Sequence, residues 1–141
     1  MESQVERAGT MVALPACAMT ERRTILLVEN DPVLRRAIRL FLDLAGFEVV
    51  ESDGVDDARH VAANSARVDA IVAELDGPGA PVEDLTRAVR RLHPRAVTVV
   101  CTSRTSASRR AALREAGVDA FVSKIDLTTQ LLPELNDRLN R

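Results

Sequence analysis

The chain of 141 residues has no tryptophan and no tyrosine, and aromatic residues make up only 2% of it. Aromatic stacking platforms for single-stranded nucleic acid or for sugars are therefore not expected, and the core must be aliphatic. Neither charge sign dominates, because 21 acidic residues face 19 basic ones. The composition thus gives no reason to expect a nucleic-acid partner. No apolar run approaches the roughly 20 residues that span a bilayer, so we expect a cytoplasmic protein without a membrane partner.

Cysteine and histidine are equally scarce, with two residues of each. Cys17 and Cys101 stand far apart in the sequence, and no group of cysteines and histidines has the spacing of a metal site. We interpret both thiols as reduced, with Cys101 buried in a strand and Cys17 exposed. His60 and His93 are isolated, and we expect both on the surface of helices.

The N-terminal residues 1–23 have neither helical nor strand period, and we expect them to form a flexible extension. A signal peptide begins with positive charge, but residues 1–10 include two acidic residues, Glu2 and Glu6, and only one basic residue, Arg7. We therefore do not expect export. An alternative hypothesis is that translation starts at Met19. Residues 24–141 remain for one domain, a length that can bury a single core.

From residue 24 onward, short apolar runs alternate with segments of helical period. Strands are predicted at residues 24–28, 47–52, 69–75, 96–102 and 118–123. Helices are predicted at residues 32–45, 55–65, 82–92 and 106–116, with Leu85, Val89 and Leu92 of the third turned inward. A last helix should begin near Thr129, because Pro133 is tolerated only in a first turn. This alternation predicts an α/β domain with a doubly wound parallel sheet of five strands.

Three of the predicted strands end in polar residues. Glu29-Asn30-Asp31 follows the first strand, Glu74 ends the third, and Thr102 ends the fourth. Ligands bind beyond the carboxyl ends of the strands in open parallel sheets, so we expect these side chains to share one pocket. Asp31 directly precedes Pro32, which is typical of the start of a helix, so we expect Asp31 to cap that helix.

These landmarks resemble a known family. The segments Leu26-Leu-Val-Glu-Asn-Asp-Pro32 and Glu74-Leu-Asp-Gly-Pro-Gly79, followed by Thr102, Phe121 and Lys124, resemble the receiver domain of bacterial two-component response regulators, in particular the stand-alone chemotaxis type. The resemblance runs from Thr24 to Asn140. It implies a flavodoxin-like fold with strand order 2-1-3-4-5. It also implies the family's chemistry, which is phosphoryl transfer from a histidine kinase to an aspartate, assisted by Mg²⁺ and a lysine.

The sequence departs from the family pattern at four positions of that pocket. Glu74 stands where the family has the acceptor aspartate, Glu29 and Asn30 replace the acidic pair, and Ile125 replaces the proline after the lysine. We therefore expect no bound metal, or at most weak Mg²⁺ binding at Glu29, Asn30 and Glu74. Because Glu74 carries one methylene more than aspartate, we expect it to reach Lys124 and form a direct ion pair or hydrogen bond.

The resemblance and these departures predict a signal-transduction interaction module that is not an enzyme and does not depend on phosphorylation. One alternative is a working phosphoacceptor that uses Glu74 or Asp76, although Asp76 is better explained as a solvated loop carboxylate. Another alternative is a receiver-like domain whose altered pocket binds a small molecule. Thr102 fits the family's switch hydroxyl, and Phe121 fits its switch aromatic or, equally well, a core residue.

The family's partner surface is formed by the fourth helix, the fifth strand and the last helix. We expect a histidine kinase, a phosphotransfer protein or another signalling protein to bind there, and a homodimer is an alternative. The predicted fourth helix has few large apolar residues, so we expect it to be mobile. Its Arg109, Arg110 and Arg114 could bind an acidic partner, but a solvated face is the more common role of such a charge run.

Overall fold

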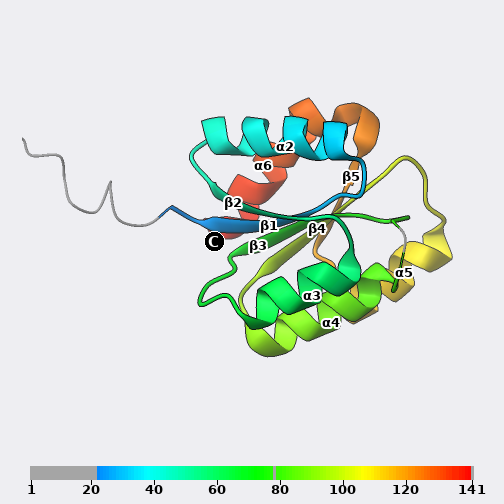
Figure 1. Cartoon of the computed structure of the whole chain (residues 1–141). Helices are drawn as coiled ribbons and strands as arrows, with labels where there is room; N and C mark the ends of the chain where they lie inside the picture. Colours follow the sequence, from blue (N-terminus) through cyan, green and yellow to red (C-terminus); the bar gives the residue numbers. More distant parts are fainter. Residues whose placement is uncertain (1–21, 78, 141) are drawn as a thin grey trace, which may run out of the picture.

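A parallel sheet lies between two layers of helices in the computed structural model, which describes residues 22–77 and 79–140 (Figure 1). The strands are β1 (Thr24–Val28), β2 (Glu48–Ser52), β3 (Ala70–Glu74), β4 (Val97–Thr102) and β5 (Ala120–Ser123). They pair in parallel in the order β2-β1-β3-β4-β5. The predicted fold class and strand order are both confirmed.

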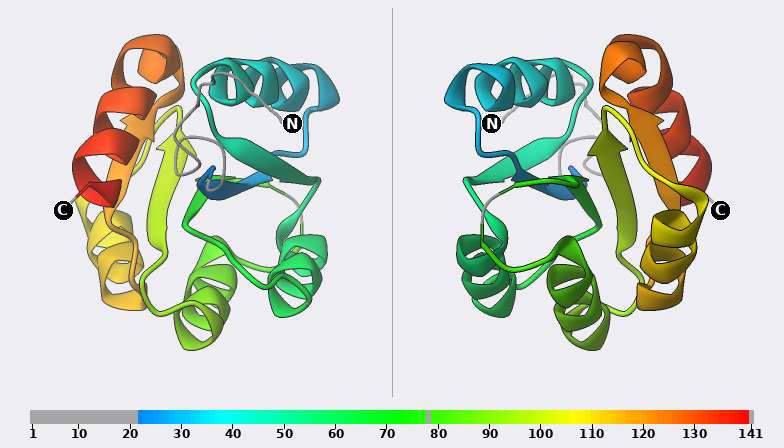
Figure 2. Two further views of the ribbon diagram at one scale, coloured as in Figure 1. Left: turned by 90° about the vertical axis from the view of Figure 1, so that its left-hand side faces the viewer. Right: turned by 90° about the vertical axis from the view of Figure 1, so that its right-hand side faces the viewer.

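The helices divide between the two faces of the sheet, as Figure 2 shows. Helices α2 (Pro32–Leu44) and α6 (Leu127–Leu139) cover one face, and α3 (Val55–Ala63), α4 (Val82–Leu92) and α5 (Ala107–Ala116) cover the other. Each face has its own aliphatic cluster, with Leu42 and Leu131 in the first and Leu85 and Leu113 in the second. The inner strand β1 is apolar without alternation because both of its sides are buried.

The ends of the helices follow local sequence signals. Asp31 caps α2 by accepting hydrogen bonds from the backbone N–H groups of Val33 and Leu34, at 2.9 and 3.4 Å, and Pro32 is the first helical residue. This confirms the predicted cap. Gly117 ends α5 with φ +119°, a left-handed conformation that glycine adopts without strain. Local sequence signals thus set the start of α2 and the end of α5.

Helix α6 begins earlier than the sequence predicted. The chain passes from β5 through the 3₁₀ helix η1 (Lys124–Asp126) directly into α6 at Leu127, so Pro133 lies inside the helix. The prediction of a start near Thr129 was wrong because Leu127, Leu131 and Leu135 are all buried against the sheet. Their packing offsets the loss of one helical hydrogen bond at the exposed Pro133.

Two predictions near the end of α4 were also wrong. Leu92 was expected to face the core, but it is 49% exposed because the helix ends there, beyond the part of the core that Leu85 and Val89 fill. His93 was expected on a helix surface, but it is half-buried at the C-cap, where its Nε2 lies 3.0 Å from the carbonyl oxygen of Ala62. His93 therefore connects the end of α4 to the end of α3.

Residues 1–21 of the predicted N-terminal extension lie outside the described residues. Arg22 donates a hydrogen bond to the carbonyl oxygen of Gly46, at 3.2 Å, and pairs with Asp43 at 3.0 Å. The Arg23 side chain donates to the carbonyl oxygen of Leu139. The chain is thus anchored to the domain just before β1. Within the described residues, no helix is both long enough and apolar enough to cross a membrane.

Candidate functional site

The candidate site lies at the carboxyl ends of β1, β3 and β5. Glu29 directly follows β1 and is 3% exposed, and its Oε2 accepts a hydrogen bond from the backbone N–H of Asp31 at 3.1 Å. Asn30, the next residue, is exposed. The carboxylate of Asp31 is occupied as the cap of α2. Of the three polar residues after β1, only Glu29 therefore has a buried carboxylate that points into the pocket.

Glu74 reaches from the end of β3 to the loop that follows β1. Its side chain is 11% exposed, and its Oε2 accepts a short hydrogen bond from the backbone N–H of Asn30. The loop after β3 passes close above it, because a Cβ added to Gly77 would lie 3.1 Å from the same oxygen. A longer side chain at Gly77 would collide with the glutamate. The extra methylene of Glu74 thus places its carboxylate against neighbouring backbone instead of leaving it free.

Lys124 lies between the two glutamates. Its Nζ is 3.7 Å from Oε1 of Glu29 and 3.9 Å from Oε1 of Glu74. The predicted Glu74–Lys124 ion pair is present, although both distances exceed a normal hydrogen bond and the lysine is shared with Glu29, which the sequence analysis did not foresee. We name this group of Glu29, Glu74 and Lys124 the strand-end cluster. Two carboxylates and one ammonium leave it with an excess negative charge.

Burial raises the pKa of Glu29 above its usual value of 4.5, and the nearby Glu74 carboxylate acts in the same direction. The hydrogen bond from Asp31 and the charge of Lys124 oppose this rise but do not cancel it. The proton therefore binds more tightly to Glu29 in the folded chain than in the unfolded chain. This makes the stability of the domain depend on pH.

We expect the variant Glu29→Gln to abolish this dependence. A carboxyl group with a raised folded-state pKa contributes stability fully below its unfolded pKa, and that contribution is lost as the pH rises through the folded pKa. Glutamine does not ionise and still accepts a hydrogen bond. The free energy of unfolding of the variant, relative to the natural chain, should therefore increase from about pH 4 to about pH 8. Urea denaturation at several pH values measures this difference.

The matched control for this prediction is Glu48→Gln, because Glu48 is exposed at the start of β2. Its free energy of unfolding relative to the natural chain should be nearly constant over the same pH range. A difference between Glu29→Gln and the natural chain that did not change with pH would contradict the assignment of the raised pKa to Glu29.

Thr102 and Phe121 lie near the cluster but have their own partners. Thr102 is buried, and its hydroxyl donates to the carbonyl oxygen of Arg104 at 2.8 Å and accepts from the N–H of the same residue at 3.1 Å. The hydroxyl thus binds the loop after β4. The ring of Phe121 is half-buried against the core on the side of α5.

Two arginines of α5 cover the Phe121 ring. The guanidinium carbons of Arg110 and Arg114 lie 5.4 and 5.1 Å from the ring centroid, which are cation–π distances. Arg109 instead pairs with Glu83 of α4 at 3.1 Å. The sequence analysis treated these arginines as a solvated or partner-binding charge run and missed their contacts. Their i, i+4 spacing, which puts Arg110 and Arg114 on one helical face, was the available signal.

Asp76, the other candidate acceptor, is exposed on the loop after β3. It lines a separate hollow together with Arg104 and Arg109, away from the strand-end cluster. This position is consistent with a solvated loop carboxylate.

The donor set fits Mg²⁺ poorly. Across residues 22–77 and 79–140, no three acidic, histidine or cysteine side chains gather in a way that could hold a metal ion. Glu29 and Glu74 each have one oxygen engaged with a backbone N–H, and both lie near the Lys124 ammonium. Magnesium requires near-ideal octahedral oxygen geometry. The strand-end cluster therefore does not supply the set of free oxygen ligands that Mg²⁺ requires.

Comparisons with known proteins agree with this architecture. The family model described as the response regulator receiver domain matches residues 25–135. The nitrate/nitrite response regulator protein NarP of Escherichia coli K12 is 31% identical over 101 residues, which cover 71% of this chain and 47% of that protein. The cyclic di-GMP phosphodiesterase of Thermotoga maritima is 29% identical over 72% of this chain and 27% of that protein. The chain thus spans half or less of the length of these relatives.

Solved structures show the same fold. The chemotaxis protein CheY4 of Vibrio cholerae superimposes with a TM-score of 0.77 at 21% identity, covering 83% of this chain and 98% of that one. The signal receiver domain of an HD domain-containing protein from Pseudomonas fluorescens Pf-5 also gives a TM-score of 0.77, at 20% identity, with coverages of 85% and 96%.

Proposed function

Because the chain belongs to the response regulator receiver domain family, we propose that it serves two-component signalling as an interaction module that does not depend on phosphorylation. The observation that carries this proposal is the state of Glu74. Its Oε2 accepts the N–H of Asn30, and its Oε1 lies 3.9 Å from the Lys124 ammonium. A nucleophilic carboxylate must present a free oxygen in line with the phosphoryl group. Glu74 is engaged at both oxygens instead.

The surroundings of Glu74 support the same conclusion. The family's chemistry needs a metal to neutralise charge that develops on the phosphoryl oxygens, and the carboxylates here are few and already partnered. In that chemistry Lys124 would bind a phosphoryl oxygen, but here its ammonium group pairs with Glu29 and Glu74. Thr102 likewise has its hydroxyl bound to the Arg104 backbone. Each group that the reaction would use therefore already has a partner within the chain.

Receiver domains interact with kinases and phosphotransfer proteins, and we propose that the partner of this chain binds at α5, β5 and α6. A hollow of about 330 Å³ opens there, and its lining includes Arg110, Phe121, Asp126 and Gln130. Helix α5 buries only Leu113 and Ala116, so few contacts hold it to the core. A surface with an aromatic ring, guanidinium groups and a loosely held helix suits protein binding.

Incubation with acetyl phosphate and Mg²⁺, followed by intact-mass measurement, tests this proposal. We expect no increase by the mass of one phosphoryl group, while a receiver domain that carries the acceptor aspartate, treated in parallel, should show it. A stable increase that peptide mapping assigned to Glu74 or Asp76 would overturn the proposal and establish a working phosphoacceptor.

A further inference from the structure

A second surface lies on α3 and α4, which pack side by side on the sheet face opposite α2 and α6 (Figure 2). Between them runs a groove of about 470 Å³, lined by residues of both helices. From α3 come Arg59, His60 and Ala63, and from α4 come Arg91 and Leu92. The groove belongs neither to the strand-end cluster nor to the surface of α5, β5 and α6.

The positive charge of this groove is not balanced within the described part of the chain. Arg59 and Arg91 are exposed, and neither forms an ion pair with any described residue. Asp56 is the one carboxylate among the described residues that line the groove. Asp56 lies in the first turn of α3, where its Oδ2 is 3.0 Å from the position that a Cβ on Gly79 would take, and it forms no ion pair with either arginine. Both guanidinium groups are therefore available to carboxylates of a partner.

The groove also has an apolar part. Leu92 is 49% exposed, contrary to its predicted inward orientation, and Ala63 is exposed opposite it on α3. An exposed leucine in the same groove as two arginines provides apolar area for a partner side chain, while the guanidinium groups select its charge. Arginine and apolar contact area together are characteristic of binding surfaces.

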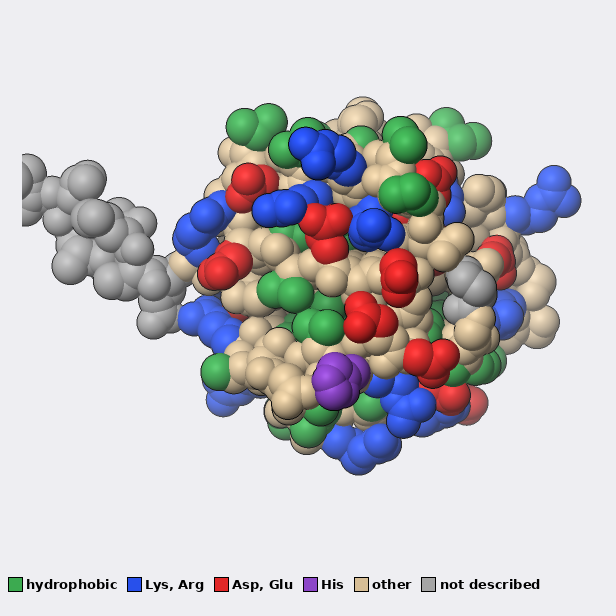
Figure 3. Space-filling model, viewed as in Figure 1, with side chains coloured by type: hydrophobic (Ala, Val, Ile, Leu, Met, Phe, Trp, Pro, Cys, Tyr) green, Lys and Arg blue, Asp and Glu red, His purple; other side chains and the backbone are tan. Residues whose placement is uncertain are grey.

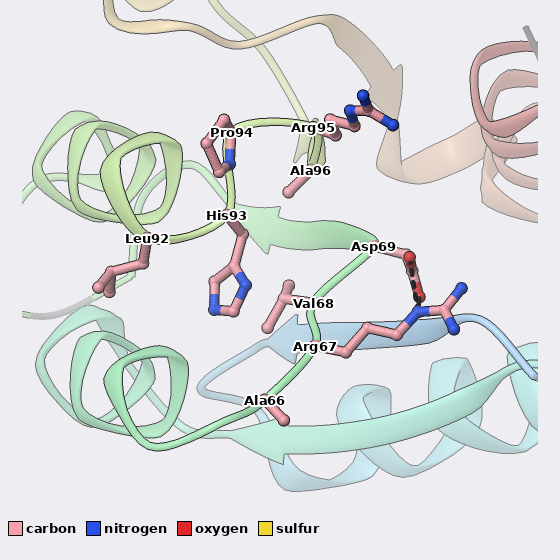
Figure 4. Close-up of a pocket in the computed structure, with 9 residues that line it drawn as sticks. All are labelled: Ala66, Arg67, Val68, Asp69, Leu92, His93, Pro94, Arg95 and Ala96. Carbon is pink, nitrogen blue, oxygen red and sulfur yellow. Dashed lines mark hydrogen bonds and ion pairs between the residues drawn. The ribbon is translucent and has the colours of Figure 1, made fainter.

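The two helices that form the groove are joined at their carboxyl ends. The contact between His93 Nε2 and the carbonyl oxygen of Ala62, at 3.0 Å, connects the end of α4 to the end of α3. Lys and Arg side chains lie along the lower edge of the molecule in Figure 3, where α3 and α4 lie, with acidic side chains beside them at the right. At the amino ends of β3 and β4, Leu92 also lines an adjoining hollow of about 340 Å³, with Arg95 at its rim (Figure 4).

We propose that this groove binds a short acidic, amphipathic segment of a partner protein, with carboxylates opposite Arg59 and Arg91 and an apolar side chain against Leu92. Charge complementarity selects an acidic occupant, since the lining has two unpaired guanidinium groups and one carboxylate. A nucleic acid is disfavoured because the described residues that line the groove include no phenylalanine, tyrosine or tryptophan for base stacking. The nine residues of α3 make the groove about 13 Å long, so the occupant is a few turns of helix or an extended stretch.

The test is a titration with a synthetic helical peptide that has Glu and Leu on adjacent faces, followed through amide shifts in ¹⁵N-labelled full-length chain. Saturable shifts should appear in α3 and at the end of α4. The variant Arg59→Glu/Arg91→Glu should weaken binding by at least about tenfold, because two attractive contacts become repulsive. Both arginines are exposed, so the fold should persist, and circular dichroism checks this. A peptide with Lys in place of Glu should not bind.

The matched control is Arg36→Glu, since Arg36 is an exposed arginine of α2 on the other face of the sheet and has no ion pair with a described residue. It should keep the affinity of the natural chain. Equal loss in this control and in the double variant, or no saturable shift in α3 and α4, would overturn the proposal. Binding of duplex DNA or phosphatidylglycerol vesicles through Arg59 and Arg91, without peptide binding, would also overturn it.

Discussion

Replacing Asn30 and Glu74 together by aspartate (N30D/E74D) should increase the affinity for Mg²⁺ by at least about tenfold and allow phosphoryl uptake from acetyl phosphate. Glu74→Asp removes one methylene and withdraws the carboxylate from the N–H of Asn30, which leaves an oxygen free. Asn30→Asp adds a negative charge at an exposed position next to Glu29. The double variant then offers three carboxylates at the strand ends, which suit a hard cation.

Calorimetric titration with Mg²⁺ measures the first effect, and intact-mass measurement with acetyl phosphate measures the second. Each single variant is a control and should gain less than the double variant, since the two changes act on different requirements. Adding Lys124→Met to the double variant should remove phosphoryl uptake but keep Mg²⁺ binding, because the lysine binds phosphoryl oxygen and not the metal. A double variant with the same Mg²⁺ affinity as the natural chain would show that features outside these two positions keep the metal away.

Leu135→Ala should lower the free energy of unfolding by about 2 to 5 kcal/mol, the largest loss of stability we expect from one substitution. Leu135 is 0% exposed and packs in the cluster that α2 and α6 form on the sheet. Its truncation removes buried apolar area and leaves a cavity. The residue lies two positions after Pro133, so the loss also measures how firmly the second half of α6 is packed.

Urea denaturation followed by circular dichroism gives this free energy. Leu44→Ala is the matched control, because Leu44 is also a helical leucine but is 89% exposed, and its effect should stay within about 0.5 kcal/mol. If Leu135→Ala were as mild as Leu44→Ala, α6 beyond Pro133 would not be packed on the sheet in solution.

Much of the fold could be predicted because its signals are local. The apolar run 69–75 between polar turns marked a buried strand, and Asp31 with Pro32 marked the start of α2. The pairing of Glu74 with Lys124 was also predicted, and parallel strands bring their carboxyl ends to one edge of the sheet. The sharing of Lys124 with Glu29 was not predicted, and Thr102, which was expected in the same pocket, binds the Arg104 backbone instead.

The features that could not be predicted depend on contacts between separate helices and strands. The predicted start of α6 was too late because the cost of Pro133 inside a helix is a local property of the sequence. The packing of Leu131 and Leu135 on the sheet, which offsets that cost, is not. The periodicity of α4 assigned Leu92 to the inward face but could not show that the helix extends beyond the core there. The contact of Arg110 and Arg114 with Phe121 joins α5 to β5, and their i, i+4 spacing puts both on one helical face but does not identify Phe121 as their partner.

The strand-end cluster joins β1, β3 and β5 through one lysine between two glutamates. Under the proposed function, this arrangement is set by the chain itself, and no modifying enzyme changes it. The fraction of partner that is occupied then follows mass action, and it depends on the concentration of this protein and on the dissociation constant. Control of the signal would thus pass from the rates of phosphorylation and dephosphorylation to the rates of synthesis and degradation. The strength of the signal would then depend on the amount of this protein in the cell.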